Sequence, residues 1–275
     1  MAKTKILFVT HEMTPFLELS KISEITRHLP QAMQEKGFEI RILMPRFGVI
    51  NERRNRLHEV IRLSGMNIVV DNTDNPLIIK VASLPAARMQ VYFLDNEEFF
   101  QRKKVFTDDS GKFFADNAER SMFFCKGVME TVRKLGWAPD VVHCHGWFTS
   151  LVPAYLKEVY NTDPIFKDSQ VLFSLYNEEM AGELGERYAQ MASADLGEGI
   201  VEKFGKGSLQ DLYKGALSYS DIAVVMEEGV PSEVIDLAKS KEVEVIEGLV
   251  QEEGNYDAFE ELFARFETEE EEQAV

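Results

Sequence analysis

The spacing of apolar residues changes twice within the first 47 positions, and these changes predict three elements. Ile6 to Val9 form a continuous apolar run, which is typical of a strand buried on both faces. From Ser23 apolar residues recur at three- and four-residue steps, which predicts an amphipathic helix that ends at Gly37. Ile40 to Leu43 predict a second strand, which Pro45 ends. Together they form a βαβ unit, and such units bind ligands at the carboxyl ends of their strands.

The rest of the chain alternates in the same way. Further strands are expected at residues 67–70, 77–81, 90–93, 171–177 and 222–225, and one ending near Cys144, with turns at 71–76 and 85–88. Helices are expected at residues 117–134, 150–160, 211–220, 231–239 and 256–266. Residues 178–202 have no clear pattern. The predicted fold is α/β, with a doubly wound, mostly parallel, Rossmann-like sheet.

Acidic residues are concentrated at the end of the chain, which indicates a domain at residues 1–240 and an acidic extension at residues 241–275. The extension holds thirteen acids and two bases, a net charge of −11, which leaves −6 of the total of −17 for the first 240 residues. Neither part has the clustered Lys and Arg that nucleic-acid backbones require. Apolar runs are too short for a membrane helix or a signal peptide, and the two cysteines, Cys125 and Cys144, are expected to be reduced thiols. A cytoplasmic location is therefore expected.

The extension contains one amphipathic helix with an apolar stripe. The stripe consists of Tyr256, Phe259, Leu262, Phe263 and Phe266. It is expected to pack on this domain's own core or on a second copy of the chain. The alternative is that it binds in a groove of a partner protein. Glu267 to Glu272 are expected to form a disordered, solvating tail.

Three stretches stand out as motifs: Glu12 to Phe16, residues 116–120 and Pro139 to Trp147. Together they resemble one known family, the bacterial glycogen synthases and plant starch synthases. The family's opening Glu-x-x-Pro-Phe matches Glu12 to Phe16, and its Asp-Asn-Ala-Glu-Arg run matches residues 116–120. Its Pro-Asp-Val-Val-His-x-His-Asp-Trp matches Pro139 to Trp147 except at Gly146, which stands at the family's second aspartate. The resemblance covers about residues 3–225 and implies the N-terminal half of a two-Rossmann (GT-B) glycosyltransferase. The positions that correspond to the family's cleft are Glu12, Ser20, Lys21, Asp116, Asn117, His145, Trp147 and Asn177.

The family's donor loop, Lys-x-Gly-Gly-Leu-Gly-Asp, is changed here. Glu18 stands at the lysine position, and Ser20, Lys21 and Ser23 stand at the glycines. Glycines let a backbone approach a diphosphate closely, so these side chains obstruct a sugar-nucleotide site. Phe148 also replaces a histidine that contacts the transferred sugar in the family, and its side chain makes no hydrogen bond.

About 49 residues follow Met226, too few for the second domain that the family requires. The resemblance implies glucosyl transfer from ADP-glucose to α-1,4-glucan. The changed loop predicts instead a pseudoenzyme that binds or scaffolds, through a protein partner or self-association, with weak ADP-glucose or α-glucan binding at most. The alternatives are an active glucosyltransferase completed by a partner chain, and a different small-molecule activity in the changed cleft. No catalytic residue, metal or cofactor is predicted, because no nucleophile–base pair or metal set stands out.

Overall fold

The computed structural model describes residues 3–84, 87, 89–240, 243–249 and 256–266. Within these ranges one sheet has the strand order β10-β9-β8-β7-β1-β2-β6-β5-β3, and β4 pairs with β5. The strands are β1 (Lys5–Thr10), β2 (Glu39–Pro45), β3 (His58–Glu59), β4 (Met66–Val70), β5 (Thr73–Ser83), β6 (Gln90–Asp95), β7 (Val141–His145), β8 (Gln170–Leu175), β9 (Ile222–Val225) and β10 (Glu244–Ile246). The α-helices are α1 (Lys21–Glu35), α2 (Glu52–Asn55), α3 (Glu97–Phe100), α4 (Asn117–Leu135), α5 (Val152–Ala154), α6 (Glu186–Leu196), α7 (Gly199–Phe204), α8 (Leu209–Leu217), α9 (Ser232–Ser240) and α10 (Asp257–Ala264).

The sheet is parallel from β10 to β6 and antiparallel at β5, β3 and β4. This confirms the mostly parallel α/β fold. The first βαβ unit is also confirmed, because β1 pairs with β2 in parallel and α1 connects them. The apolar run from Ile6 to Val9 is completely buried, as expected for a central strand.

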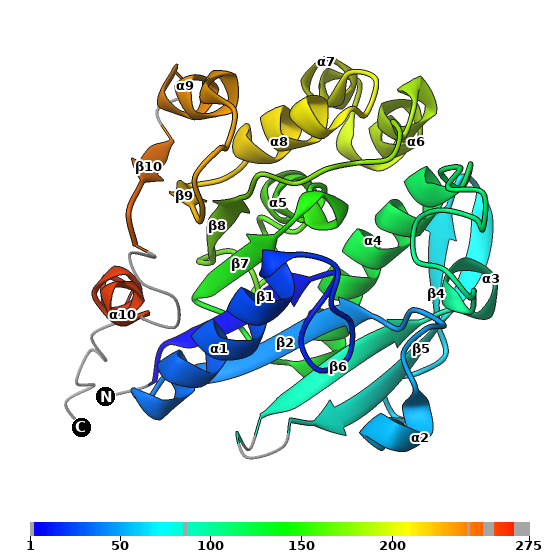
Figure 1. Cartoon of the computed structure of the whole chain (residues 1–275), viewed down its shortest axis with the longest axis horizontal. Coiled ribbons are helices and arrows are strands. Elements are labelled where there is room, and N and C mark those ends of the chain that lie inside the picture. Colours follow the sequence, from blue (N-terminus) through cyan, green and yellow to red (C-terminus); the bar gives the residue numbers. More distant parts are fainter. Residues whose placement is uncertain (1–2, 85–86, 88, 241–242, 250–255, 267–275) are drawn as a thin grey trace.

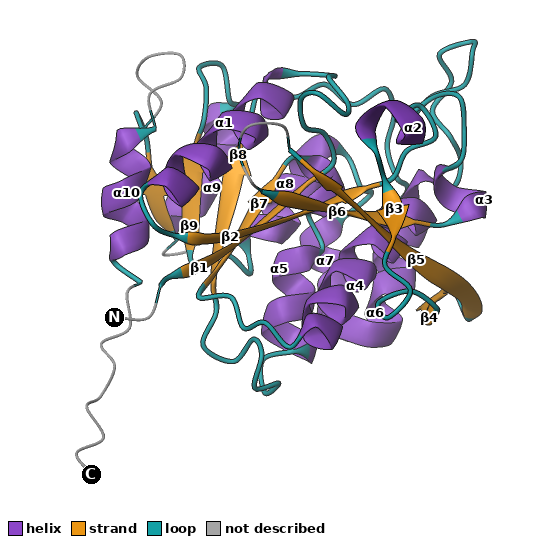
Figure 2. Ribbon diagram, turned by 90° about the horizontal axis from the view of Figure 1, so that it is seen from below, coloured by secondary structure: helices purple, strands orange, loops and turns teal. Residues whose placement is uncertain are grey.

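Helices cover both faces of the sheet. Figure 1 shows α1 in front of β1 and β2, with α4 and α5 behind the sheet, and Figure 2 shows the sheet between these layers. On the side of α4 and α5, α5 also contacts α8, and α4 contacts α6. The layers bury the central strands and leave their carboxyl ends as one edge of the sheet.

Several parts of the chain differ from the sequence-based expectation. The turn expected at 71–76 is confined to Asp71 and Asn72, which both have positive φ (48° and 59°), as a tight hairpin turn requires. The helix expected at 150–160 becomes a π-helix at Tyr155–Val159, because the Tyr160 amide donates to the Tyr155 carbonyl, five residues back. The unassigned residues 178–202 contain α6 and the start of α7.

The C-terminal helix α10 packs against the domain's own core. Its Phe263 ring lies 6.3 Å from Phe8 of β1 and 6.0 Å from Phe38, and its Phe259 ring lies 6.2 Å from His143 of β7. The expectation of docking on this core is confirmed. Four stripe residues are buried and Phe266 is partly buried, so in this arrangement the stripe is not free to bind a partner.

Residues beyond 240 also extend the sheet, because β10 pairs with β9 in parallel. The domain boundary at residue 240 stays a prediction, and the acidic run from Glu267 to Glu272 lies outside the described residues. In the described ranges, every helix is too short or too polar to cross a bilayer.

Candidate functional site

A hollow of about 670 Å³ lies where the loops after β1, β7 and β8 meet. It therefore occupies the edge of the sheet at which parallel α/β folds bind ligands. Residues of the segment 103–113 form its outer wall. The lining comprises His11, Glu12, Leu17, Leu19, Ser20, Val49, Lys103, Lys104, Val105, Phe106, Thr107, Phe113, Trp147, Asn177, Glu178, Glu179, Met180 and Ala181.

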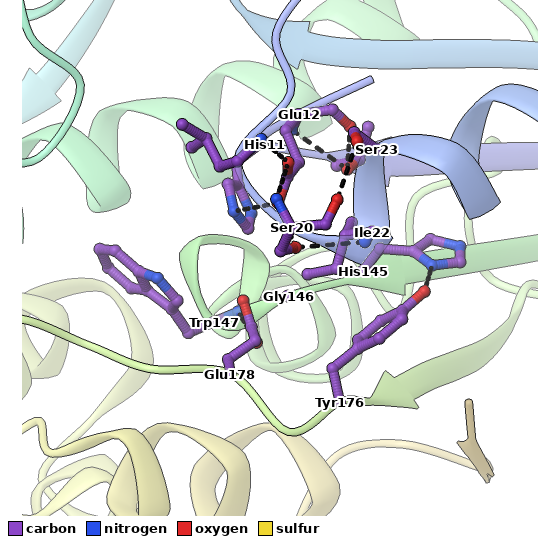
Figure 3. A network of polar contacts seen from close by, with 12 residues as sticks. His11, Glu12, Ser20, Ile22, Ser23, His145, Gly146, Trp147, Tyr176 and Glu178 are labelled. Carbon is purple, nitrogen blue, oxygen red and sulfur yellow. Dashed lines mark hydrogen bonds and ion pairs between the residues drawn. The ribbon is translucent and has the colours of Figure 1, made fainter. Parts of the chain in front are cut away.

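The carboxylate of Glu12 holds the loop that leads into α1. One oxygen, Oε2, accepts hydrogen bonds from the backbone amides of Leu19 (2.6 Å) and Ser20 (2.8 Å). The other, Oε1, accepts one from the Ser20 hydroxyl at 2.6 Å. Figure 3 shows Glu12 and Ser20 facing each other at the start of α1. A fully buried carboxylate is thus satisfied by three donors of its own chain.

The next amides at the start of α1 also have partners within the chain. Ser20 is the N-cap, and its hydroxyl oxygen accepts a hydrogen bond from the Ile22 amide at 3.1 Å. The Ser23 amide donates to the Ser20 carbonyl at 3.3 Å. A helix N-terminus binds a phosphate through free amides. At residues 19, 20, 22 and 23 those amides are already used.

His11 fills the space beside Gly146. The imidazole is 3% exposed, its Nε2 lies 3.5 Å from Glu12 Oε1, and within the described residues its Nδ1 has no hydrogen-bond partner. A Cβ at Gly146 would lie 2.5 Å from His11 Cε1, and Gly146 has a φ of +79°. The aspartate that the resembled family has at this position would therefore clash with His11. Burial lowers the pKa of His11, and the nearby Glu12 charge opposes this shift.

Glu178 connects the loops after β7 and β8. Its Oε2 accepts a hydrogen bond from the Trp147 amide at 3.0 Å and another from the Tyr213 hydroxyl of α8. Burial raises the pKa of Glu178 to about 8, although both hydrogen bonds lower it. At neutral pH this carboxyl group is therefore mostly protonated.

His145 does not face the hollow. It is completely buried, and its Nδ1 shares a hydrogen bond of 2.7 Å with the Tyr176 hydroxyl. Its ring lies 4.0 Å from that of His143, so the two histidines share one face of β7, as their spacing predicted. Figure 3 shows Tyr176 pointing at His145, away from Trp147. Phe148 is buried between the rings of Phe124 and Phe106.

Asp116 and Asn117 lie outside the hollow as well. Asp116 occupies the N-cap position of α4, but its side chain makes no capping hydrogen bond and pairs with Arg102 (Oδ1 to Nη1, 2.8 Å). Asn117 is buried and binds Arg120 and the Phe106 carbonyl. Both residues therefore support the outer wall, although the sequence places them next to a cleft.

Four of the eight predicted cleft residues line the hollow: Glu12, Ser20, Trp147 and Asn177. Lys21 does not line it. The Lys21 side chain is 76% exposed, and its Nζ lies 3.5 Å from Glu227. Sequence reasoning missed Glu178, Phe106 and the lysines 103 and 104. Glu178 was detectable, because it follows the last residue of a predicted strand. The described residues contain no group of three or more His, Cys, Asp or Glu side chains that fits a metal ion.

Comparison with known proteins places this geometry in a family. A family model described as the starch synthase catalytic domain matches residues 5–247. The glycogen synthase of Chlorobium phaeobacteroides is 42% identical over 174 residues, which are 63% of this chain and 36% of that protein. The glycogen synthase of Chlorobium limicola is 41% identical over 174 residues, with the same coverage. The matched region thus spans about 36% of these relatives.

Among solved structures, the catalytic domain of starch synthase IV from Arabidopsis thaliana, bound to ADP and acarbose, has a similar fold. The TM-score is 0.73 at 17% sequence identity, over 90% of this chain and 51% of that one. At this identity the similarity shows the fold, and it agrees with the expected half of a two-domain glycosyltransferase.

Proposed function

We propose a function from the premise that this chain belongs to the starch synthase catalytic domain family. In this proposal the chain is a pseudoenzyme. It keeps the fold and binds through the hollow, but by itself it transfers no glucosyl group from ADP-glucose. Function depends on site chemistry rather than on the fold, so the proposal rests on the loop before α1.

The single observation that carries the proposal is the state of the loop before α1: Glu12 occupies the amides of Leu19 and Ser20, and Ser20, Lys21 and Ser23 stand where the family has glycines. A sugar nucleotide brings a diphosphate, which needs free amides or cations where it binds. Here the amides hold a carboxylate, and Glu18 adds a further negative charge on the same loop. Of the two ligands in the Arabidopsis structure, ADP is the one that carries a diphosphate, so in this proposal the loop before α1 binds no such ligand.

An active glucosyltransferase completed by a partner chain is the second candidate. The observation that favours it is the exposed apolar rim of the hollow, where the Leu19 and Val49 side chains are 49% and 41% exposed. Another polypeptide would remove this apolar surface from water. In this candidate the partner would also supply the cations for the diphosphate.

Two measurements on the purified chain test the proposal. The first is glucosyl transfer from ADP-glucose to glycogen, and the second is calorimetric titration with ADP-glucose, ADP and maltooligosaccharides. We expect no glucosyl transfer, and no heat of binding when ADP-glucose or ADP is titrated. Transfer by the unaltered chain would refute the pseudoenzyme. Binding of ADP-glucose without transfer would favour the completed enzyme.

A variant and its control make the titration informative. Glu12→Gln removes the charge that occupies the loop amides, whereas Glu18→Gln removes a charge from an exposed side chain of the same loop. If Glu12 closes the loop to phosphate groups, ADP binding should appear or strengthen in Glu12→Gln and not in Glu18→Gln. Equal behaviour of the two variants would contradict a specific role of Glu12.

A further inference from the structure

The walls of the hollow are mainly aromatic and aliphatic. Phe106 and Trp147 lie with their ring centroids 4.8 Å apart, and Phe113 lies 6.1 Å from Trp147. Leu19 and Val49 form an exposed apolar rim. A flat aromatic body stacks well on tilted rings such as these, and the neutral polar side chains of the lining that could bind sugar hydroxyl groups are Ser20, Thr107 and Asn177. The walls therefore favour a ligand with an aromatic body.

Two lysines at the hollow carry positive charge without a counter-ion. Lys103 and Lys104 are both exposed and both contribute to the lining. Across the described ranges neither forms an ion pair or a hydrogen bond, whereas Lys21 near the same edge is paired with Glu227. Two adjacent unpaired ammonium groups attract an anion, most strongly where water is partly excluded.

The carboxyl groups of the inner wall do not cancel this attraction. The charge of Glu12 is held by two amides and a hydroxyl. Glu178 is mostly neutral at pH 7, because burial raises its pKa to about 8. Glu179 is the exposed carboxylate of the lining, and among the described residues it forms no ion pair with either lysine. The two lysines therefore stay without a direct ionic partner next to apolar surface.

We propose that the hollow binds a small organic anion with an aromatic body, of the aryl carboxylate or aryl sulfonate class. The body lies against Phe106, Phe113 and Trp147, and the anionic group lies at Lys103 and Lys104. This inference deepens the proposed binding function and rests on it. A volume of about 670 Å³ suits one such molecule.

Calorimetric titration with naphthalene sulfonate tests the inference, with naphthalene methanol as the uncharged match. We expect the sulfonate to bind more tightly than the alcohol. The double variant Lys103→Glu/Lys104→Glu should lower the affinity for the sulfonate about tenfold and change the affinity for the alcohol by less than about twofold. A loss of about 1.4 kcal/mol of charge interaction corresponds to a factor of ten in affinity. Equal affinity of the two ligands, or no binding of the sulfonate, would overturn the inference.

The matched control changes the same charges elsewhere. Lys134→Glu/Lys167→Glu alters two exposed lysines that do not line the hollow, so sulfonate binding should be unchanged. A similar loss in both double variants would mean that only overall charge matters, and this would refute a site at Lys103 and Lys104.

Tryptophan emission locates the ligand. The chain has two tryptophans, Trp147 in the hollow and Trp137 outside its lining, beside Arg41. In a Trp137→Phe variant, sulfonate binding should change the emission of Trp147 with the same affinity that calorimetry gives. Binding that leaves this emission unchanged would place the ligand elsewhere and refute the inference.

The failures of the two proposals can be told apart. If maltooligosaccharide displaced the sulfonate, the hollow would be a sugar site, and this inference would be overturned. The proposal that the chain transfers no glucosyl group would not be affected. Glucosyl transfer by the unaltered chain would overturn the pseudoenzyme, whereas lysine-dependent sulfonate binding would still assign the ligand class.

Discussion

At the scale of single residues, Glu12 has the largest effect on the candidate site. A buried carboxylate is costly unless hydrogen bonds compensate the loss of water. Glu12 accepts hydrogen bonds from the backbone amides of Leu19 and Ser20, and these bonds hold the loop before α1 in place. In the proposed function, the contacts that stabilise the loop also leave these two amides unavailable to a phosphate.

Glu12→Gln should destabilise the folded chain. The substitution replaces a charged acceptor of the Leu19 and Ser20 amides by a neutral one, so both hydrogen bonds lose their charge-assisted part. We expect a loss of about 2 kcal/mol in the free energy of unfolding, measured by urea denaturation. The exposed Glu18→Gln should change it by less than about 0.5 kcal/mol. Equal stability of the two variants would contradict the role given to Glu12.

At the scale of elements, α10 depends on tertiary packing. It has eight residues, and an isolated helix of this length is not stable in water. Phe259 and Phe263 are completely buried against β1, β7 and Phe38. Figure 1 shows α10 near the carboxyl end of α1, where Lys36 pairs with Asp257 at 2.9 Å, at the side of the sheet that ends in β10. The helix therefore exists because it completes the core.

Phe263→Ala should lower the free energy of unfolding by about 3–5 kcal/mol, because it leaves a cavity between α10 and the sheet. Phe266→Ala, at the partly buried end of the stripe, is the matched control and should cost less than half as much. Urea denaturation followed by far-UV circular dichroism measures both. If the two substitutions cost the same small amount, α10 does not pack as described.

At the scale of the whole molecule, three of the five histidines are buried in one region. Burial lowers the pKa of His11, His143 and His145, and the pKa of His143 falls to about 3. The folded chain therefore keeps these rings neutral, while the unfolded chain protonates them below about pH 6.5. Glu178 has the opposite effect on the pH dependence of stability. Its pKa is raised to about 8, so the folded chain holds a proton that the unfolded chain has already lost.

The free energy of unfolding should therefore be highest near neutral pH and decrease as the pH falls below about 6.5. Each buried histidine contributes up to about 1.4 kcal/mol per pH unit, and three histidines outweigh the single opposing carboxyl group. Urea denaturation between about pH 7.5 and 5 measures the slope. The control is His58→Gln, which removes the imidazole of an exposed histidine and should leave the slope unchanged. A flat profile, or higher stability at pH 5, would contradict buried neutral histidines.

Most of the fold was predictable from apolar spacing. The continuous apolar run at Ile6–Val9 and the apolar positions Ile40, Ile42 and Leu43 indicated the correct βαβ unit. Strand β10 and helix α6 were missed. The three residues of β10 are too few to show a period, and α6 starts within an acidic segment that masks its apolar face.

The candidate site was predictable only in part, and the reason is geometric. Residue types and family resemblance indicated Glu12, Ser20, Trp147 and Asn177 because they follow predicted strands or begin a helix. Tertiary structure decided that His145 turns toward Tyr176, that His11 fills the space beside Gly146, and that the segment 103–113 closes the hollow. These contacts join residues far apart in the chain. Local spacing determines which elements form, whereas the packing of loops against one another determines which side chains meet.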